Sequence, residues 1–428
     1  MKRKYRKNDP KSSRPVGDDD EGLQVRLSRA QLEQMMQDGL HSLALELGRV
    51  CAVAMLEDEV VQLCGEPRSR DQPRQYVRYG YNPGWISLGG QKLSVNHPRV
   101  RHTDDRGEVP LTKYRQMQQT DRADDGVLRR MVRGVSCRNY EQVVDTARKG
   151  YGLKASSVSR AFKRMTAGKV KAFCSRRWEG TRFVVIYIDG KTYAGQQMIT
   201  ALGLTADGHK HILGLRQGTT ENAEVVQDLL TDLDARGVAS DEMTLFVLDG
   251  SKALAAGVKR VWNEYAEVQR CQLHKRRNIE SYLAKEYHGE LRGRLHAAWR
   301  ETDYEAARRQ LEQTVHWLEN INPDAARSLQ EGLEETLTVV RLGVTGLLRE
   351  SLSNTNVIES AYSIVERVTG RVTRWRRGDM RWRWCATGLQ LAESKFRRVD
   401  GYLGLPLLVA ALDRIAREKG LDRKKSVA

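Results

Sequence analysis

Two apolar runs in the middle of the chain each lead into an aspartate and a glycine, and they constrain the fold more than any other feature. The runs are TRFVVIYIDG (181–190) and MTLFVLDG (243–250). Runs so rich in β-branched and aromatic residues are typical of central strands that are buried on both faces. The sequence therefore predicts two central strands of an α/β sheet, each ending at its aspartate.

The segments around these runs predict the order of the sheet. Residues 198–218 read as a hairpin that turns at Asp207-Gly208, and EVQRC (267–271) reads as a short strand. Apolar residues three or four positions apart predict helices at 221–236 and 251–265. The resulting order is β-β-β-α-β-α-β-α, which is the order of a ribonuclease-H-like mixed sheet.

The length of 428 residues exceeds one ordinary core, so we expect several domains. Residues 1–23 are charged and predict a disordered tail. Residues 24–175 read as a mainly helical DNA-binding region, and 176–278 as the first part of the α/β domain. An all-helical insertion is predicted at 279–348, and 349–428 read as further helices with an Arg-rich segment.

The N-terminal region contains a predicted helix, a hairpin and a helical pair. The helix runs from about Ser28 to Cys64, and Gly-Gly between ISL and KLSV predicts a small β-hairpin. Two amphipathic segments, 139–147 and 156–165, flank RKGYGLKA and fit either a helix-turn-helix or an ordinary helical hairpin. In the first interpretation, these residues would face DNA: Ser159, Arg160, Lys163 and Arg164.

The excess of basic residues indicates a polyanionic partner. With 72 Lys and Arg against 55 Asp and Glu, the formal net charge is +17. Nucleic acid is the first candidate and a membrane surface the second, although a merely soluble basic protein also fits. The sequence has no run of 18 apolar residues, no secretory signal and six scattered cysteines. We therefore expect a cytoplasmic protein with reduced thiols and no membrane partner.

Asp189 and Asp249 are the candidate metal ligands. Ligands gather at the carboxyl ends of strands in an α/β sheet, and a ribonuclease-H-like order would place these two ends side by side. A single such aspartate would read as a turn former, but two of them favour Mg²⁺ or Mn²⁺ binding. Two divalent ions suit phosphoryl transfer and need a third carboxylate, which on position alone is either Glu359 or Glu366.

The segment CQLHKRRNI (271–279) follows the last predicted strand. Cys271 and His274 have zinc-ligand spacing, but no second Cys or His pair follows at matching spacing, so zinc is not expected. The two side chains either assist beside the carboxylates, near a phosphate, or are a buried cysteine with a partly exposed histidine. In the first case, the next basic residues would neutralise the DNA backbone: Lys275, Arg276 and Arg277.

A segment rich in arginine and tryptophan, RVTGRVTRWRRGDMRWRWC, spans residues 367–385. Arginine binds phosphate in a bidentate manner, so contact with double-stranded DNA is predicted for Arg371, Arg374, Arg376 and Arg377. The tryptophans can either stack on unpaired bases or belong to the core, and the sequence leaves both open.

Five segments together resemble the Mutator-type bacterial insertion-sequence transposases. They are FVVIYIDGKTY, LFVLDGSKAL, CQLHKRRNI, SLSNTNVIES and RVTRWRRGDM, and the similarity covers most of the chain. The resemblance implies a ribonuclease-H-like DDE transposase in which Asp189, Asp249 and Glu359 bind the metal ions. The family's Asn-x-x-Glu pattern, at Asn356 to Glu359, selects Glu359 over Glu366.

The resemblance also implies the reaction and its partners. The family's Cys-x-x-His pattern falls on Cys271 and His274, whereas Ser360 stands where many relatives have arginine. The implied activity is metal-dependent cleavage at element ends and strand transfer into target DNA. The N-terminal region would bind terminal inverted repeats, and a homodimer or larger assembly would hold two ends. The alternatives are a ribonuclease-H-like nuclease without strand transfer and a non-catalytic DNA-binding repressor.

Overall fold

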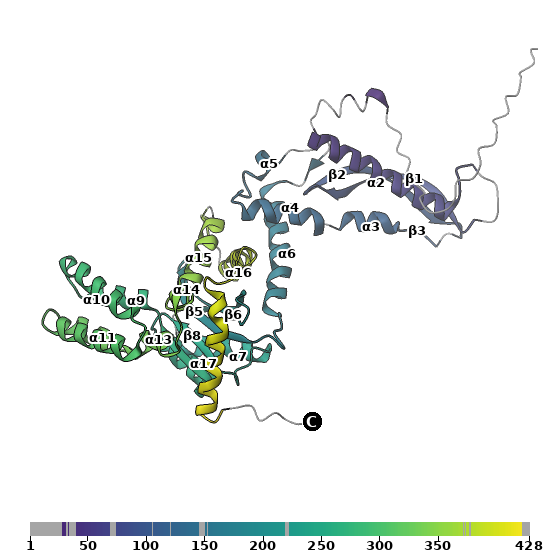
Figure 1. The fold of residues 1–428 in the computed structure, drawn as a ribbon. Coiled ribbons are helices and arrows are strands. Elements are labelled where there is room, and N and C mark those ends of the chain that lie inside the picture. The colour runs from purple at the N-terminus through teal and green to yellow at the C-terminus, as the bar shows by residue number, and fades with distance from the viewer. Residues whose placement is uncertain are drawn as a thin grey trace, which may run out of the picture. The chain divides into compact units, whose positions relative to one another are not determined.

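The protein forms two compact units in a computed structural model (Figure 1). The described residues are 28–30, 33, 40–68, 74–104, 106–119, 121–144, 150–151, 153–218, 222–370, 372, 374–375 and 378–421. The first unit comprises Met1–Val127 and Cys137–Ser159, and the second comprises Leu128–Ser136 and Arg160–Ala428. The predicted tail at 1–23 lies outside the described residues.

A long antiparallel hairpin forms most of the sheet of the first unit. Strand β1 (Tyr76–Leu88) pairs with β2 (Gln91–His102), and β2 also pairs with the short strands β3 (Glu108–Val109) and β4 (Gly150–Tyr151). The hairpin turns at Gly89 and Gly90, whose φ angles of 59° and 82° suit a tight two-residue turn. The predicted hairpin is confirmed, and its strands are longer than ISL and KLSV indicated.

Helices cover one face of this hairpin. Helix α2 (Leu40–Cys64) lies along β1 and β2 in Figure 1, and its apolar side chains cluster with those of the strands. Helix α3 (Thr112–Gln118) packs on the same side through Tyr114 and Met117. The predicted helix from Ser28 is confirmed over α2, and most of residues 31–39 lie outside the described part.

The two segments that could form a helix-turn-helix differ in length. The first is the one-turn helix α5 (Tyr140–Val143), which follows α4 (Asp121–Val132), and the second is α6 (Ala155–Cys174). Strand β4 lies between α5 and α6 and pairs with β2, so the connection is more than a simple turn. Val158 and Phe162 of α6 are buried.

The second unit contains a five-stranded mixed sheet in the order β7-β6-β5-β8-β9. Its strands are β5 (Phe183–Tyr193), β6 (Gln196–Thr205), β7 (Lys210–Gly218), β8 (Thr244–Leu248) and β9 (Ala266–Arg270). Strands β5, β6 and β7 are antiparallel neighbours, whereas β8 and β9 run parallel to β5. This sequence of strands and helices confirms the predicted order.

Helices cover both faces of this sheet. Ile186, Ile188 and Phe246 cluster with α7 (Ala223–Ala235) and α8 (Lys252–Trp262) on one face. Val185, Tyr187 and Val247 cluster with helices on the other face, because successive side chains of a strand alternate between faces. The helices of that second face include α15 (Asn356–Thr369), α16 (Met380–Glu393) and α17 (Leu405–Glu418).

A run of helices connects β9 to α15. They are α9 (Gln272–Glu280), α10 (His288–Arg300), α11 (Tyr304–Glu319), α12 (Pro323–Gln330), α13 (Thr338–Arg341) and α14 (Gly346–Leu352). Trp299 donates a hydrogen bond to Thr336, and Trp317 packs edge-on against Tyr287. Both tryptophans therefore make packing contacts among these helices. Across the ranges that the structure describes, no helix is both long and apolar enough to cross a membrane.

One strand prediction is wrong. Strand β5 does not end at Asp189 but continues to Tyr193. Its last residues pair with β6, with Asp189 opposite Thr200 and Tyr193 opposite Gln196, before the chain turns at 194–195. The parallel pairing with β8 does stop at Ile188, so Asp189 lies at the end of one ladder and in the middle of another.

Candidate active site

Asp189 and Asp249 are neighbours across two parallel strands. Ile188 of β5 lies opposite Leu248 of β8, and each aspartate is the next residue of its strand. Adjacent strands lie about 5 Å apart, so the two aspartates follow side by side at the carboxyl end of this strand pair. A backbone N–H, that of Ser251, donates to Asp249 Oδ1 at 2.8 Å and orients that carboxylate.

Both aspartates belong to the sheet face that α15 covers. Asp189 follows Val185 and Tyr187 at intervals of two, and these two side chains cluster with α15 residues. Asp189 is only 6% exposed. A buried carboxylate needs partners that offset its lost hydration, and cations are the strongest ones.

Tyr362 fixes α15 next to Asp189. Its hydroxyl shares a hydrogen bond of 2.7 Å with the Thr200 hydroxyl and donates to the Met198 carbonyl at 3.1 Å. Thr200 is the residue opposite Asp189 on β6. Glu359 precedes Tyr362 by three positions on α15, so the two side chains lie on the same side of the helix, one turn apart.

Glu359 contacts two cationic side chains. Its Oε1 lies 3.6 Å from His274 Nε2 and 3.6 Å from Arg277 Nη1. The alternative third carboxylate, Glu366, is directed elsewhere and pairs with Lys191 Nζ at 2.7 Å. Glu359 contacts His274, whose pKa is also raised by the charges of Asp189 and Asp249. Of the two glutamates, only Glu359 has this link to the aspartates.

The Cys271–His274 pair connects the end of β8 to the start of α15. The Cys271 N–H donates to the Leu248 carbonyl at 2.7 Å, which holds the start of α9 beside the end of β8. The Thr355 hydroxyl lies 3.7 Å from Cys271 Sγ and 3.4 Å from His274 Nδ1. The residue before α15 is therefore joined to the first turn of α9.

Negative groups around His274 favour its charged form. A hydrogen bond with Cys271 outweighs the effect of burial and, with the charges of Asp189 and Asp249, raises the pKa of His274. Burial alone would raise the pKa of the Cys271 thiol, but the hydrogen bonds with His274 lower it. The raised pKa of His274, next to Glu359, fits a negative electrostatic potential at this end of the sheet.

The donor atoms of the three acidic residues suit a hard divalent cation, because all of them are carboxylate oxygens. Within the described ranges, no group of three or more His, Cys, Asp or Glu side chains is arranged so that it could hold a metal ion. Glu359 is instead directed at His274 and Arg277. The feature of the structure that fits cation binding here is the adjacency of two carboxylates, Asp189 and Asp249, of which Asp189 is buried.

The basic residues of α9 take different positions. Lys275 is 1% exposed, and its ammonium group donates to the carbonyls of Ser328 and Glu331. The prediction that Lys275 contacts DNA is therefore wrong, because its ammonium faces the protein interior. Arg276 is half-buried, and the Arg277 side chain is 53% exposed.

The other predicted DNA contacts are partly described. Arg160, Lys163 and Arg164 of α6 are exposed, and Ser159 is half-buried. Arg374 is exposed, whereas three other predicted contacts of its segment lie outside the described residues: Arg371, Arg376 and Arg377.

The tryptophans of the C-terminal segment pack inside the second unit. Trp384 is 5% exposed and stacks on Phe162 with ring centroids 4.2 Å apart. Trp382 donates to the Leu215 carbonyl at 3.4 Å, and Trp375 meets the Tyr193 ring edge-on. Core packing is thus the observed role of these rings.

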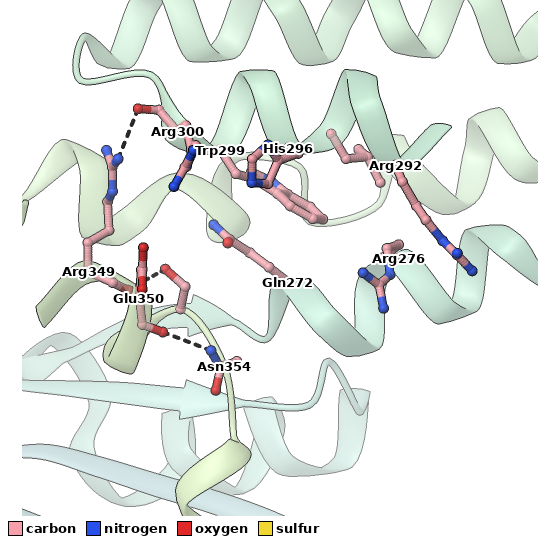
Figure 2. A pocket seen from close by; sticks show the side chains of 11 residues that line it. Gln272, Arg276, Arg292, His296, Trp299, Arg300, Arg349, Glu350 and Asn354 are labelled. Carbon is pink, nitrogen blue, oxygen red and sulfur yellow. Dashed lines mark hydrogen bonds between the residues drawn. The ribbon is translucent and has the colours of Figure 1, made fainter. Parts of the chain in front are cut away.

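A basic cavity of about 250 Å³ is lined by residues of α9, α10 and α14 and of the segment before α15 (Figure 2). Gln272 and Ser353, which line it, are the chain neighbours of the site segments at Cys271 and Thr355. Figure 2 shows Trp299 and His296 projecting from α10 above Gln272. The charged residues of its lining are four arginines and one glutamate: Arg276, Arg292, Arg300, Arg349 and Glu350.

Sequence reasoning missed two residues that organise the site. Tyr362 anchors α15, and the only sequence signal for it is its spacing of three residues from Glu359. Thr355 reads from the sequence as a helix cap, so its contact with Cys271 and His274 is visible only in the structure.

Comparisons with known proteins identify the family of the chain. The model of the family described as "Transposase, Mutator family" matches residues 21–375. The chain is 27% identical over 349 residues to the transposase for insertion sequence element ISRM5 of Rhizobium meliloti (strain 1021), covering 78% of this chain and 82% of that protein. It is 24% identical over 314 residues to the transposase for insertion sequence element IS256 in transposon Tn4001 of Staphylococcus aureus, covering 70% and 76%.

The chain contains a mixed α/β sheet with paired aspartates, and a transposase family matches most of its length. These two findings define the class of this protein as a transposase. More particularly, the chain belongs to the Mutator family of transposases, and the named relatives act for bacterial insertion sequences.

Proposed function

We propose that this chain is a DDE transposase that cuts the ends of an insertion sequence and joins them to target DNA. Asp189, Asp249 and Glu359 would hold two divalent ions, Mg²⁺ or Mn²⁺. The observation that carries the proposal is that the two aspartates adjoin on one sheet face while Tyr362 pins the helix of Glu359 to the same face.

The fold proposed for the second unit is ribonuclease-H-like, interrupted by a helical insertion at about 279–348. The strand order β7-β6-β5-β8-β9, with three antiparallel strands before two parallel ones, supports this assignment. Helices α10 to α13 lie between β9 and the helix of Glu359, where such an insertion would fall.

The residues of the site would act mainly through position and charge. Bound divalent ions would supply charge neutralisation at the phosphodiester and activation of the attacking oxygen. Asp189 and Asp249 offer fixed carboxylates, since a strand end is a rigid support. His274 and Arg277 orient Glu359, and Thr355 orients His274.

The proposed reaction has two phosphoryl transfers. Water first attacks a phosphodiester at the element end, breaking the bond to the 3′-oxygen, which leaves as a 3′-hydroxyl. That hydroxyl then attacks a target phosphodiester, forming one new P–O bond as another breaks. The joining step needs no external energy source, because one phosphodiester replaces another. Two ends must be held together, so a homodimer or a larger assembly is proposed.

Double-stranded DNA would approach along the exposed cations. Arg276 and Arg277 of α9, Arg374 and the arginine-lined cavity of Figure 2 lie on segments adjoining the carboxylates and would neutralise backbone phosphates. The exposed face of α6 would add contacts through Ser159, Arg160, Lys163 and Arg164.

The proposal is tested by cleavage and joining with the full chain and a duplex that carries the element end. Asp189→Asn, Asp249→Asn and Glu359→Gln should each lower metal-dependent cleavage by about 100-fold or more while the DNA remains bound. Glu366→Gln, two turns further along the same helix, is the matched control and should cleave as the unaltered chain does.

A pre-cut duplex with a free 3′-hydroxyl separates the alternatives. Cleavage without joining would identify a ribonuclease-H-like nuclease, and binding without any nicking would identify a repressor. Strand transfer at the unaltered rate by Asp189→Asn or Glu359→Gln would overturn the assignment of the carboxylates.

A further inference from the structure

In the first unit, the β1–β2 hairpin is basic, whereas the helix α2 that packs against it is acidic. Its strands carry four basic residues, Arg78, Lys92, Arg99 and Arg101, and neither strand contains Asp or Glu. Helix α2, which packs against it, contains four acidic residues and a single arginine. The basic layer of this unit is therefore the hairpin.

Three of the four basic side chains lie on the hairpin face that α2 does not cover, whereas Arg78 pairs with Glu57 of α2 at 3.9 Å. Ile86, Leu93 and Val95 point toward α2 and form one apolar cluster with it. Because side chains alternate along a strand, Trp85 and Lys92 point the other way. Farther along β2, Val100 is completely buried in a cluster with Leu56 and Val60 of α2, so its neighbours Arg99 and Arg101 point away from α2 there. We call this the outer hairpin face; its members are Tyr79, Trp85, Lys92, Arg99 and Arg101.

Aromatic rings hold the cations of the outer hairpin face in place. Lys92 Nζ lies 3.6 Å from the centroid of the Trp85 ring. The guanidinium carbons of Arg99 and Arg101 lie 5.0 and 4.4 Å from the centroid of Tyr79, whose ring is 48% exposed. Such contacts restrict the rotamers of long basic side chains, so less conformational entropy is lost when they bind a partner.

We propose that the outer hairpin face binds double-stranded DNA, in addition to the contacts proposed for α6. The major groove, about 12 Å wide, admits a two-stranded β-ribbon. The two strands themselves contain no carboxylate, and Glu108 of the adjoining strand β3 pairs with Arg99, which leaves Lys92 and Arg101 as the principal cations of the face. Ser87 and Ser94 add hydrogen-bonding groups beside them. The inference rests on the proposed function, since a transposase must also bind the DNA that flanks the phosphodiester bonds that it cuts.

The charge of the face is the argument for DNA against other occupants. A surface for a membrane or a second copy of the chain would expose mainly apolar side chains. On β1 and β2, the large exposed hydrophobic residues are limited to Val77, Tyr79 and Tyr81.

The experiment measures DNA affinity of the full chain as a function of salt. The double variant Lys92→Gln/Arg101→Gln is compared with the unaltered chain by fluorescence anisotropy, using an element-end duplex and an unrelated duplex. Each lost phosphate contact should weaken binding about eightfold at 0.1 M salt and reduce the slope of log K against log salt by about 0.9. Arg309→Gln, exposed on α11 of the second unit, is the matched control.

A second variant guards against misfolding of the hairpin. Ser94→Glu places a negative charge on the exposed part of the same face without removing a packing contact. It should also weaken binding, with an unchanged circular dichroism spectrum. Unaltered affinity and salt slope in both variants would overturn the proposal. So would a change in sedimentation without DNA, which would instead identify the face as a contact between copies.

The outcome separates this inference from the proposed function. At saturating DNA concentrations, the hairpin variants should still cleave with Mg²⁺, because the carboxylates are intact. If the unaltered chain never cleaves but the variants lose affinity, the proposed function fails and the DNA-binding face stands. If the unaltered chain cleaves and the variants bind fully, the inference about the hairpin fails alone.

Discussion

Thr355 shows how a single hydroxyl can connect two segments of the site. Thr355 occupies the N-cap position of α15. Its hydroxyl makes no capping bond, however, and is directed instead at Cys271 and His274. The stabilisation that a cap would give the helix is thus replaced by a link to α9.

Removal of this hydroxyl should impair the reaction more than the fold. Thr355→Val keeps the shape of the side chain but leaves His274 Nδ1 without this partner. The rate of cleavage should therefore fall about 10-fold, which is typical when a residue that orients the side chains of a metal site is replaced. Thr355→Ser retains the hydroxyl and should retain most of the activity. Equal activity of the Val and Ser variants in a cleavage assay would show that the contact is not used.

Lys275 and Arg277 should respond oppositely to substitution. Lys275→Gln removes the donor to two buried carbonyls and should lower the free energy of unfolding by about 2 kcal/mol without changing the salt dependence of DNA binding. Arg277→Gln should leave stability nearly unchanged and reduce the salt slope by about 0.9. Urea unfolding and anisotropy titrations check the two effects, and a reduced salt slope for Lys275→Gln would contradict the burial of its ammonium.

At the scale of elements, Glu393 fastens α16 to the edge strand β7. Its Oε1 accepts hydrogen bonds from Arg176 at 2.9 Å and from the Ile212 N–H at 3.0 Å. Burial alone would raise the pKa of Glu393, but bonds from His211, Arg176 and Ile212 outweigh burial and lower it. A carboxyl group with a lowered pKa stabilises the fold where it is ionised.

The contribution of Glu393 should depend on pH in a defined direction. At pH 7, Glu393→Gln should cost about 2 kcal/mol of unfolding free energy, because a charged partner of Arg176 is lost. The difference should shrink as the pH falls below about 4.5, since the carboxylate of the unaltered chain then becomes protonated. Urea unfolding at pH 7 and at acid pH checks this, and a difference that persists or grows in acid would contradict it.

The attachment of α15 can be measured by a double-mutant cycle. Tyr362→Phe leaves the buried Thr200 hydroxyl without this partner and should cost about 1–3 kcal/mol of unfolding free energy. Adding Thr200→Val should cost little more, because both polar groups are then absent. Fully additive losses would show that the two hydroxyls are not coupled.

The sequence predicts elements better than contacts. Apolar runs locate β5 and β8, and Gly-Gly locates the turn of the hairpin, because periodicity and turn preferences are local. The end of β5 is mispredicted, since it depends on pairing with β6 beyond Asp189. The burial of Lys275 could not be foreseen, because its carbonyl acceptors lie more than fifty residues away in the chain.

The candidate site follows the same rule. Both aspartates can be found from strand pattern alone, but the choice of Glu359 over Glu366 needs the family resemblance. The structure adds a physical distinction, because Glu366 is paired with Lys191 whereas Glu359 faces His274.

At the scale of the whole molecule, each unit has its own hydrophobic core. Leu93 is completely buried in a cluster with α2, and Ile186 is completely buried between the larger sheet and its helices. Separate cores predict that the two units unfold in separate transitions.

Single core substitutions should therefore act on one transition at a time. Leu93→Ala should destabilise the first unit by about 2–5 kcal/mol and leave the transition of the second unit in place. Ile186→Ala, the counterpart in the second unit, should do the reverse. Differential scanning calorimetry resolves the transitions, and a single transition that both substitutions shift equally would contradict the two-core interpretation.

The covering of the Asp189 face by α15 has a consequence for how the protein is made on the ribosome. All five strands of the sheet have been translated by Arg270, whereas α15 begins only at Asn356. At about 5–20 residues per second, the growing chain spends roughly 5–20 s with both aspartates synthesised and Glu359 still missing. A nascent chain that stops before Glu359 would lack the proposed third carboxylate, so the proposed nuclease activity would begin only after that residue has been translated.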